Sequence, residues 1–244
     1  MKKYRSSILA AIVLLIYSTM LEKGQLEGFV IDFPPEKILT KIKNKNNTEI
    51  IGQALRIYYE PTSDGSARVI SNISLPKPVE EGTLSYTLRL CDNFQFVRGG
   101  KLPGLGSEYA TTGGNLSQNS QWSVRLMFGA SGQVILYTYM PNRNTRYGES
   151  YMSDFFLERG FAYRISISIK LNSNEKEGQI LVAINNKKII MLNDVLFRKE
   201  ISDNSKIHKV LFQTFHGGHD SSWSPQVNSG KELPCADFKD VEFS

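Results

Sequence analysis

Apolar positions along the chain recur mostly with a period of two rather than with the helical period. The segment Arg164–Lys170 alternates strictly between polar residues and isoleucine, which is typical of a half-buried antiparallel strand. Clusters of Gly, Pro, Asn, Asp and Ser separate short runs that are rich in β-branched or aromatic residues. These runs are Ala54–Tyr59, Arg68–Leu75, Thr83–Leu90, Trp122–Phe128, Val134–Tyr139, Tyr163–Leu171, Gln179–Ile184 and Val210–Phe215. The pattern predicts an all-β fold, a two-sheet antiparallel β-sandwich of the jelly-roll type.

The first residues have the organisation of an export signal. An apolar stretch, Ile8–Tyr17, is too short to span a bilayer comfortably. Basic residues precede it: Lys2, Lys3 and Arg5. No clear A-x-A cleavage site follows, so residues 1–20 are interpreted as either a signal peptide or an uncleaved signal-anchor. A secreted, extracellular protein is the expectation.

The remaining length suits one large domain, because β-sandwiches often reach this size undivided. We expect residues 21–49 to form a leader or linker and residues 50–244 to form the jelly-roll domain. Cys91 and Cys235 fit an exported protein with one disulfide, and two buried free thiols are the alternative.

The composition excludes a disordered chain, since hydrophobic residues make up 41% and charged residues 22%. The formal net charge of +5 favours polyanionic partners. Nucleic acid, an anionic membrane surface and an acidic polysaccharide all qualify, and composition alone does not choose among them.

One predicted hairpin places polar side chains together. Its strands, Gln121–Phe128 and Gln133–Met140, flank Gly129–Gly132. We predict a loop of Ala130, Ser131 and Gly132 that forms a type I turn, with Gly132 in the left-handed conformation. Gly129 then faces Gln133.

This register pairs Arg125 with Tyr137 and Ser123 with Tyr139. Because strand side chains alternate with period two, all four emerge on one face of the hairpin. The opposite face, which we expect in the core, carries Val124, Leu126 and Phe128. A face with this polar composition is better suited to a groove than to a core.

Several motifs, in order along the chain, resemble the alginate-lyase-like enzymes of polysaccharide lyase family 14 and the neighbouring glucuronan lyases. The resemblance covers roughly residues 50–243. The segments that carry it are Arg-Gly-Gly-Lys-Leu-Pro-Gly-Leu at 98–105, Trp-Ser-Val-Arg-Leu-Met at 122–127, Tyr-Thr-Tyr at 137–139, Tyr-Gly-Glu-Ser at 147–150 and Gly-Gly-His-Asp-Ser-Ser-Trp-Ser-Pro at 217–225. The implied functional residues are Lys101, Ser123, Arg125, Tyr137 and Tyr139, of which the last four are those that the hairpin register places on one face.

The resemblance implies β-elimination on a 4-linked uronate. The C5 proton is scarcely acidic while the neighbouring carboxylate keeps its charge, so Arg125 and Lys101 are expected to neutralise that charge. Tyr137 or Tyr139 is expected to act as acid or base, with the two cations stabilising the phenolate. Lys101 is an alternative base once it is partly desolvated, and Ser123 is expected to hydrogen-bond the substrate or orient a tyrosine. Activity is expected to rise above neutral pH.

Further residues are candidates for substrate binding at neighbouring positions, although ordinary surface charge explains some of them equally well. They are Gln95, Arg98, Arg143, Arg146, Tyr147 and His219. His219 is a departure, because the family motif often has another small polar residue there. The spacing of His216, His219 and Asp220 matches no strong zinc pattern, so we expect no metal and no cofactor.

Other functions fit this sequence less well. The glycines of residues 99–104 fit a simple turn, and no Walker pattern or helix follows them, which argues against a nucleotide site. No carboxylate pair accompanies the hairpin residues, which argues against hydrolysis. A non-catalytic binding module for acidic polysaccharide is the main alternative, and a structural wall or adhesion protein is the third. We predict a monomer that acts on an acidic polysaccharide, without nucleic acid and without stable membrane insertion if the leader is cleaved.

Overall fold

The computed structural model describes residues 30–42, 45–174, 177–227 and 230–244. Its compact unit runs from Asp32 to Phe243. The signal segment expected over residues 1–20 lies outside the described residues. Within the described ranges, no helix has the length and apolar character needed to cross a membrane.

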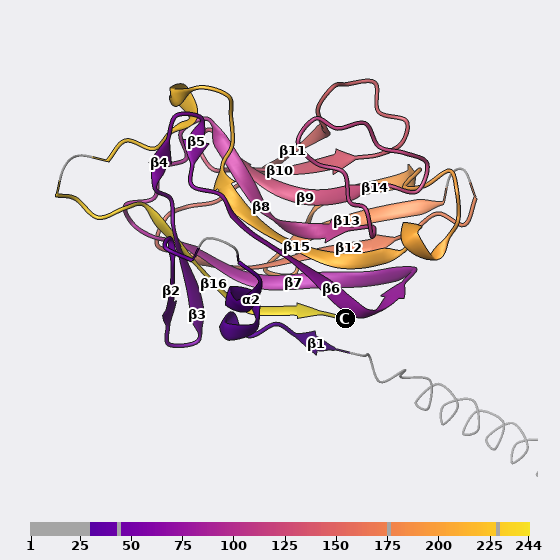
Figure 1. Ribbon diagram of the computed structural model, residues 1–244, viewed down its shortest axis with the longest axis horizontal. Coiled ribbons are helices and arrows are strands. Elements are labelled where there is room, and N and C mark those ends of the chain that lie inside the picture. The colour runs from indigo at the N-terminus through magenta and orange to yellow at the C-terminus, as the bar shows by residue number, and fades with distance from the viewer. Residues whose placement is uncertain (1–29, 43–44, 175–176, 228–229) are drawn as a thin grey trace, which may run out of the picture. The chain divides into compact units, whose positions relative to one another are not determined.

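Two antiparallel sheets form the two layers of the fold (Figure 1). The larger sheet has the order β14 (Lys187–Val195), β13 (Gly178–Ile184), β12 (Ala162–Lys170), β7 (Glu81–Leu90), β16 (Cys235–Phe243), β3 (Ala54–Tyr58) and β2 (Thr48–Ile51). The smaller sheet has the order β11 (Glu149–Phe156), β10 (Gln133–Tyr139), β9 (Ser123–Gly129), β8 (Gly99–Gly106), β15 (Ile207–His216) and β6 (Val69–Val79). The predicted two-sheet antiparallel sandwich is therefore confirmed.

Short elements complete the described chain. They are β1 (Ile31–Asp32), helix α2 (Pro35–Lys41), the hairpin β4 (Pro61–Thr62) with β5 (Gly65–Ser66), and the 3-10 turns η1 (Asp203–Ser205) and η2 (Ser221–Trp223). Ile38 of α2 is buried, as is Phe33 just before the helix, and the Ile38 carbonyl accepts a hydrogen bond from Ser71 of β6. The described residues 32–42, which lie within the expected leader or linker of residues 21–49, thus belong to the compact unit.

Alternation along the strands builds the core between the sheets. In β12 the residues Ile165, Ile167 and Ile169 are buried, while the serines between them are half-buried. The strands β9 and β10 differ, because most of their residues are buried on both faces. The larger sheet covers only one face of β9 and β10, so other parts of the chain cover their outer face.

The β9–β10 hairpin has the predicted register, with Arg125 opposite Tyr137 and Ser123 opposite Tyr139. The turn type differs from the prediction, because Ser131 has a φ of 70° in addition to Gly132 at 85°. A positive φ at the third turn position is characteristic of type II rather than type I. The loop length, which fixes the register, is unaffected.

Strand β8 was not predicted, since its sequence reads as a glycine-rich turn. Both Gly100 and Gly104 are required by close backbone approach. A Cβ at Gly104 would lie 2.0 Å from the carbonyl oxygen of Val124, and one at Gly100 would lie 2.3 Å from that of Phe215. These glycines allow β8 to insert between β9 and β15, which places Lys101 in the middle of the smaller sheet.

Cys91, directly after β7, is joined to Cys235 at the start of β16 by a disulfide with a Cα–Cα separation of 5.3 Å. The backbone amide of Cys91 also donates to the carbonyl of Cys235. Of the two alternatives that the sequence leaves open, the structure has the bonded one.

Candidate active site

A cavity of about 510 Å³ lies on the outer face of the smaller sheet, over β6, β8, β9, β10 and β15. Six residues named from the sequence line it: Lys101, Arg125, Tyr137, Tyr139, Tyr147 and His219. Strand alternation explains the grouping, because the buried side chains of Leu126 and Phe128 point the opposite way, into the core.

Lys101 enters the cavity from β8, and no acidic residue in the described part of the chain forms an ion pair with it. Its ammonium lies 3.0 Å from the sulfur of Met127 and 4.1 Å from the centre of the Tyr137 ring. Burial, reinforced by the positive charges of Arg125 and Arg68, lowers the pKa of Lys101 from 10.5 to about 7. A lysine with such a pKa exchanges protons readily near neutral pH.

Arg125 is almost fully buried, with 2% of its surface exposed. Its Nη1 donates to Oε1 of Gln213 at 2.8 Å, and Nε2 of Gln213 donates in turn to Oδ1 of Asn72 at 2.8 Å. The Nε of Arg125 has no hydrogen-bond acceptor. None of the ion pairs among the described residues includes Arg125. A buried guanidinium without a counter-charge is poised to receive an anion.

The two phenols point together at the same part of the cavity. The hydroxyl oxygens of Tyr137 and Tyr139 lie 3.4 Å apart. Each also accepts a hydrogen bond of 3.0 Å from a loop amide, that of Gly148 to Tyr137 and that of Gly114 to Tyr139. Because each phenol oxygen already accepts a hydrogen bond from an amide, its position is fixed and its own hydroxyl proton points toward another acceptor.

The expected effect of the cations on Tyr137 is not the dominant one. Burial, followed by the hydrogen bond with Tyr139, raises the pKa of Tyr137 well above its usual 10.0, and the opposing effect of Arg125 is smaller. Because a buried phenolate is poorly solvated, Tyr137 stays protonated over the physiological pH range. The interpretation of Tyr137 as a base is therefore not supported by its surroundings.

Ser123 shares the register of the hairpin but does not reach the cavity. It is fully buried, and its hydroxyl donates at 2.6 Å to the carbonyl of Thr111. Thr112 and Gly113, which follow Thr111 in the chain, line the cavity. The observed contact holds this loop in place, and substrate binding by Ser123 stays a prediction.

Arg143 braces the loops beside the tyrosines. Its Nη1 donates to Ser117 at 2.7 Å, its Nη2 donates to the Asn115 carbonyl, and its guanidinium lies 4.7 Å from the centre of the Tyr139 ring. These donors are committed to protein acceptors. The geometry indicates a positioning role where the sequence suggested substrate contact.

Gln95 and Arg98 lie outside the residues that line the cavity. Gln95 is engaged at both ends of its side chain by the backbone of Gln226. Arg98 donates to Ser222 at 2.8 Å and lies 5.5 Å from the centre of the Trp223 ring. Trp223 itself lines the cavity, so both residues support a wall of the site rather than its floor.

The neighbouring histidines point in different directions. His216 is completely buried, stacks on Phe94 and bonds through Nε2 to the carbonyl of Gln95 at 2.5 Å. Burial lowers the pKa of His216 to about 4. His219 is exposed at the cavity mouth. The two rings are therefore separated by the sheet and do not form one site.

Sequence reasoning missed several residues that line the cavity: Arg68, Asn72, Met127 and Gln213. Met127 follows Arg125 by two positions in a predicted strand, so alternation alone could have placed it on the same face. Gln213 lies in a predicted strand as well, but nothing in the sequence pairs it with Arg125.

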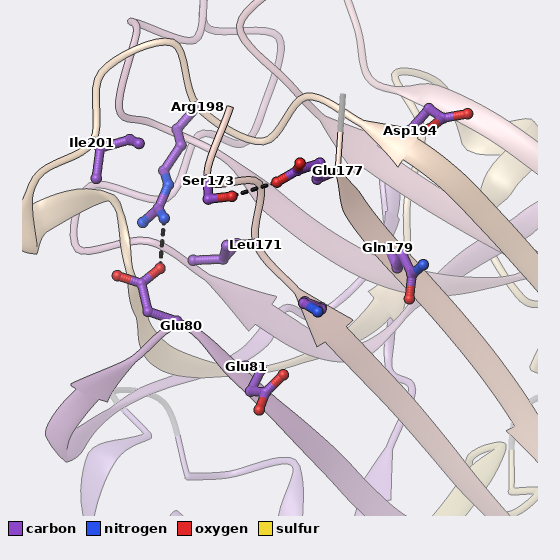
Figure 2. Close-up of a pocket in the computed structure, with 10 residues that line it drawn as sticks. Glu80, Glu81, Leu171, Ser173, Glu177, Gln179, Asp194, Arg198 and Ile201 are labelled. Atoms are coloured by element: carbon purple, nitrogen blue, oxygen red, sulfur yellow. Dashed lines mark hydrogen bonds and ion pairs between the residues drawn. The ribbon is translucent and has the colours of Figure 1, made fainter. Parts of the chain in front are cut away.

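A second cavity, of about 720 Å³, lies at another part of the molecule (Figure 2). Its walls carry the carboxylates of Glu80, Glu81, Glu177 and Asp194, and the Glu80 carboxylate pairs with Arg198 at 2.5 Å. The larger size does not make it the better candidate, because these acidic groups repel a polyanion such as the expected substrate.

Comparisons with known proteins agree with the geometry. No curated protein matches the chain. Among solved structures, a mutant of alginate lyase Aly36B in complex with an alginate trisaccharide is similar with a TM-score of 0.72 and 20% identity, covering 89% of this chain and 94% of that one. The alginate lyase from Aplysia kurodai has a TM-score of 0.65 and 25% identity, with 89% and 90% covered. An endo-β-1,4-glucuronan lyase from Trichoderma reesei has a TM-score of 0.57 and 14% identity, with 89% and 94% covered.

The family assignment comes from a family model. The model of polysaccharide lyase 14 matches residues 50–233, which hold every strand of the cavity floor. The motifs that suggested this family from the sequence lie within that range. The chain therefore belongs to polysaccharide lyase family 14 and is a polysaccharide lyase.

Proposed function

We propose that this enzyme cleaves a 4-linked polyuronate, alginate or glucuronan, by β-elimination. The observation that carries the proposal is the pairing of Lys101, whose pKa is about 7, with the buried and unpaired guanidinium of Arg125 in one cavity. The similar solved structures include alginate lyases and a glucuronan lyase, which supports this substrate class.

Arg125 supplies the counter-charge for the substrate carboxylate. Gln213 holds the guanidinium of Arg125 through Nη1, which leaves the other amino group for the substrate carboxylate. Once the carboxylate is neutralised, the C5 proton next to it becomes more acidic. The fixed charge also stabilises the enolate-like transition state more than the ground state, which is what lowers the barrier.

Lys101 is the best-placed base in this arrangement. In its neutral form it takes the proton from C5, the electron pair forms the C4–C5 double bond, and the bond from C4 to the bridging O4 breaks. O4 leaves with a proton from the newly formed ammonium, or with one from a tyrosine hydroxyl that then regains a proton from this ammonium. The products are an unsaturated uronate end and a free hydroxyl, so that atoms and charge balance.

Tyr137 and Tyr139 act as hydrogen-bond donors in this scheme. Because the raised pKa of Tyr137 keeps its hydroxyl protonated, it can donate to the substrate carboxylate or to O4. The loop amides of Gly114 and Gly148 hold the phenol oxygens in place for that role.

The test is the ultraviolet absorbance of the unsaturated product on incubation with alginate and, separately, with glucuronan. We expect product from at least one polymer, and loss of about 10²–10⁴-fold in rate for Lys101→Ala, which is the usual contribution of a general base. A matched control is Lys188→Ala, since Lys188 lies in β14 of the other sheet. Saturable binding of both polymers without any product would favour the binding-module alternative.

Export from the cell also remains a proposal, supported by the basic and apolar leader of residues 1–20 and by the disulfide. We also propose that the protein is a monomer. Fractionation of cells that express the full chain, followed by sizing of the secreted protein, tests both.

A further inference from the structure

We propose that Arg68 forms a second carboxylate-binding position in the cavity, which holds the acid group of the uronate unit next to the one that loses its proton. The inference rests on the proposed function, because only a polymer with an acid group on every unit presents two carboxylates to one groove.

The position of Arg68 separates it from the reacting carboxylate. Arg68 directly precedes β6, and its guanidinium lies 5.2 Å from the centre of the Phe215 ring. Phe215 in β15 is paired with Lys101 in β8. Across the sheet the order is therefore Arg125 in β9, then Lys101, Phe215 and finally Arg68.

The two arginines enter the cavity from different strands and contact different residues. β9 and β6 are three strand intervals apart, so their backbones lie roughly 14 Å from each other at about 4.8 Å per interval. The guanidinium of Arg125 bonds to Gln213, whereas that of Arg68 lies over Phe215 and pairs with Asp64. Two carboxylates on linked sugar units can occupy these two positions separately.

An ion pair orients the Arg68 side chain, which is still accessible to solvent. Its Nη2 pairs with Oδ2 of Asp64 at 2.8 Å, and the other oxygen of Asp64 accepts from Thr62 at 3.1 Å. About half of the Arg68 side chain, 49%, is exposed to solvent. The ion pair occupies one amino group, which leaves the remaining donors of the fork to an incoming anion at little cost in desolvation.

A purely structural role does not account for this arrangement. An exposed i,i+4 ion pair contributes little to stability. Arg68 adds to the positive charge that Lys101 and Arg125 give the cavity, in spite of its ion pair with Asp64, and this charge favours the entry of an anion. The charge of Arg68 also contributes to the lowered pKa of Lys101, so a change at Arg68 is visible in the pH profile.

The experiment compares Arg68→Ala and Arg68→Lys with the wild-type enzyme on oligouronates of increasing length and on the polymer. Arg164→Ala is the matched control, because Arg164 is a partly exposed arginine in an ion pair on the larger sheet. We expect Arg68→Ala to raise KM about tenfold or more on chains long enough to reach Arg68, as the loss of a charged hydrogen bond implies. The effect of Arg68→Ala on kcat should be much smaller. The KM of Arg68→Lys should fall between those of the wild-type enzyme and Arg68→Ala.

Two further readouts identify the cause. The KM defect of Arg68→Ala should shrink on the shortest oligomers that are still cleaved, because these do not reach Arg68. The rise of activity with pH should move to more alkaline pH, since one of the charges that favour neutral Lys101 has been removed. Arg164→Ala should show neither change.

The outcomes separate the two proposals. If wild-type enzyme yields no unsaturated product from any polyuronate, the proposed function is wrong. If wild-type enzyme is active but Arg68→Ala keeps the wild-type KM at every length, the second position is wrong. A loss in kcat that is equal for all lengths would place Arg68 at the reacting unit and would also overturn it. Should Arg68→Ala fold poorly in thermal unfolding, Arg68→Lys applies the same criteria.

Discussion

The ammonium of Lys101 lies 3.0 Å from the thioether sulfur of Met127, an acceptor far weaker than a carboxylate. This contact fills the space around the lysine with an apolar and polarisable group without stabilising its charge. Burial therefore dominates, and the pKa of Lys101 falls to about 7. The same contact joins Lys101, the proposed proton acceptor, to Met127, which lies in one of the sequence motifs but carried no assigned role.

The pH dependence of the enzyme should follow Lys101. Only the neutral amine can accept the C5 proton, so kcat/KM should rise with pH, by about tenfold per unit below the pKa, and level off above about pH 7. The measurement is the initial rate of product formation at low substrate concentration across buffers of equal ionic strength. An activity maximum on the acid side of this pKa contradicts the assignment.

Met127 provides a test of the origin of that pKa. Met127→Leu preserves an apolar contact and should leave the pH midpoint of kcat/KM close to the wild-type value. Met127→Glu places a carboxylate beside the ammonium, which stabilises the charged form, so the midpoint should move to higher pH by about one unit or more. Equal midpoints for the two variants would show that this contact does not set the pKa.

The partner of Arg125 offers a change that separates activity from stability. Gln213→Glu converts a neutral acceptor at 2.8 Å into a carboxylate that pairs with the buried guanidinium. We expect kcat/KM to fall by about 10²-fold or more, because the substrate carboxylate must then compete with an internal one. The midpoint of thermal unfolding should stay the same or rise, since a buried charge gains a partner.

The control for this substitution is Gln213→Leu, which removes the acceptor without adding a charge. It should reduce activity by less than Gln213→Glu and lower the unfolding midpoint. A Gln213→Glu enzyme with wild-type kcat/KM would mean that Arg125 does not bind the substrate carboxylate.

Arg143 should behave as a brace. Arg143→Ala removes its bonds to Ser117 and to the Asn115 carbonyl, which connect the loops on either side of Tyr139. We expect a loss of about 1–2 kcal/mol in stability, or roughly 2–8 °C in Tm, and faster hydrogen exchange in residues 112–118. The KM should change little. A large rise in KM without a change in exchange would restore the view of Arg143 as a substrate contact.

His216 should make the fold sensitive to acid. Its pKa is depressed in the folded state, to about 4 from 6.5, so the stability that its neutral form contributes is complete above 6.5 and is lost as pH falls through 4. His216→Phe cannot take up this proton. It should be less stable by about 1–3 kcal/mol at neutral pH, because the Gln95 carbonyl loses its donor.

The measurement is the difference in the free energy of unfolding between the wild-type protein and His216→Phe, obtained by denaturant unfolding at several pH values. This difference should narrow as the pH is lowered from 6.5 toward 4. A constant difference over that range would mean that His216 does not titrate as its burial implies.

Much of the site could be predicted from the sequence where contacts are local. The loop of Ala130–Gly132 fixes the pairing of β9 with β10, and period-two alternation then brings Arg125, Tyr137 and Tyr139 to one face. The strict alternation of residues 164–170 likewise predicted β12. Such features depend on short-range geometry and therefore can be read along the chain.

The glycine-rich segment shows where local patterns fail. The sequence of β8 has the composition of a turn, and its glycines are needed only because β9 and β15 approach it closely. The same applies to residues 32–42, whose apolar side chains belong to the domain because α2 packs against β6.

Only the tertiary structure decided the electrostatics of the site. Gln213 contacts Arg125 across 88 positions of sequence. Arg68 and Phe215 are in contact as well, although they lie near opposite ends of the domain sequence. Desolvation sums over all atoms packed around a group, whichever segment they come from, so the pKa values of Lys101 and Tyr137 follow from the assembled sheet. The sequence by itself determined that Arg125, Tyr137 and Tyr139 share one face of the hairpin. The three-dimensional packing decided the protonation states of Lys101 and Tyr137.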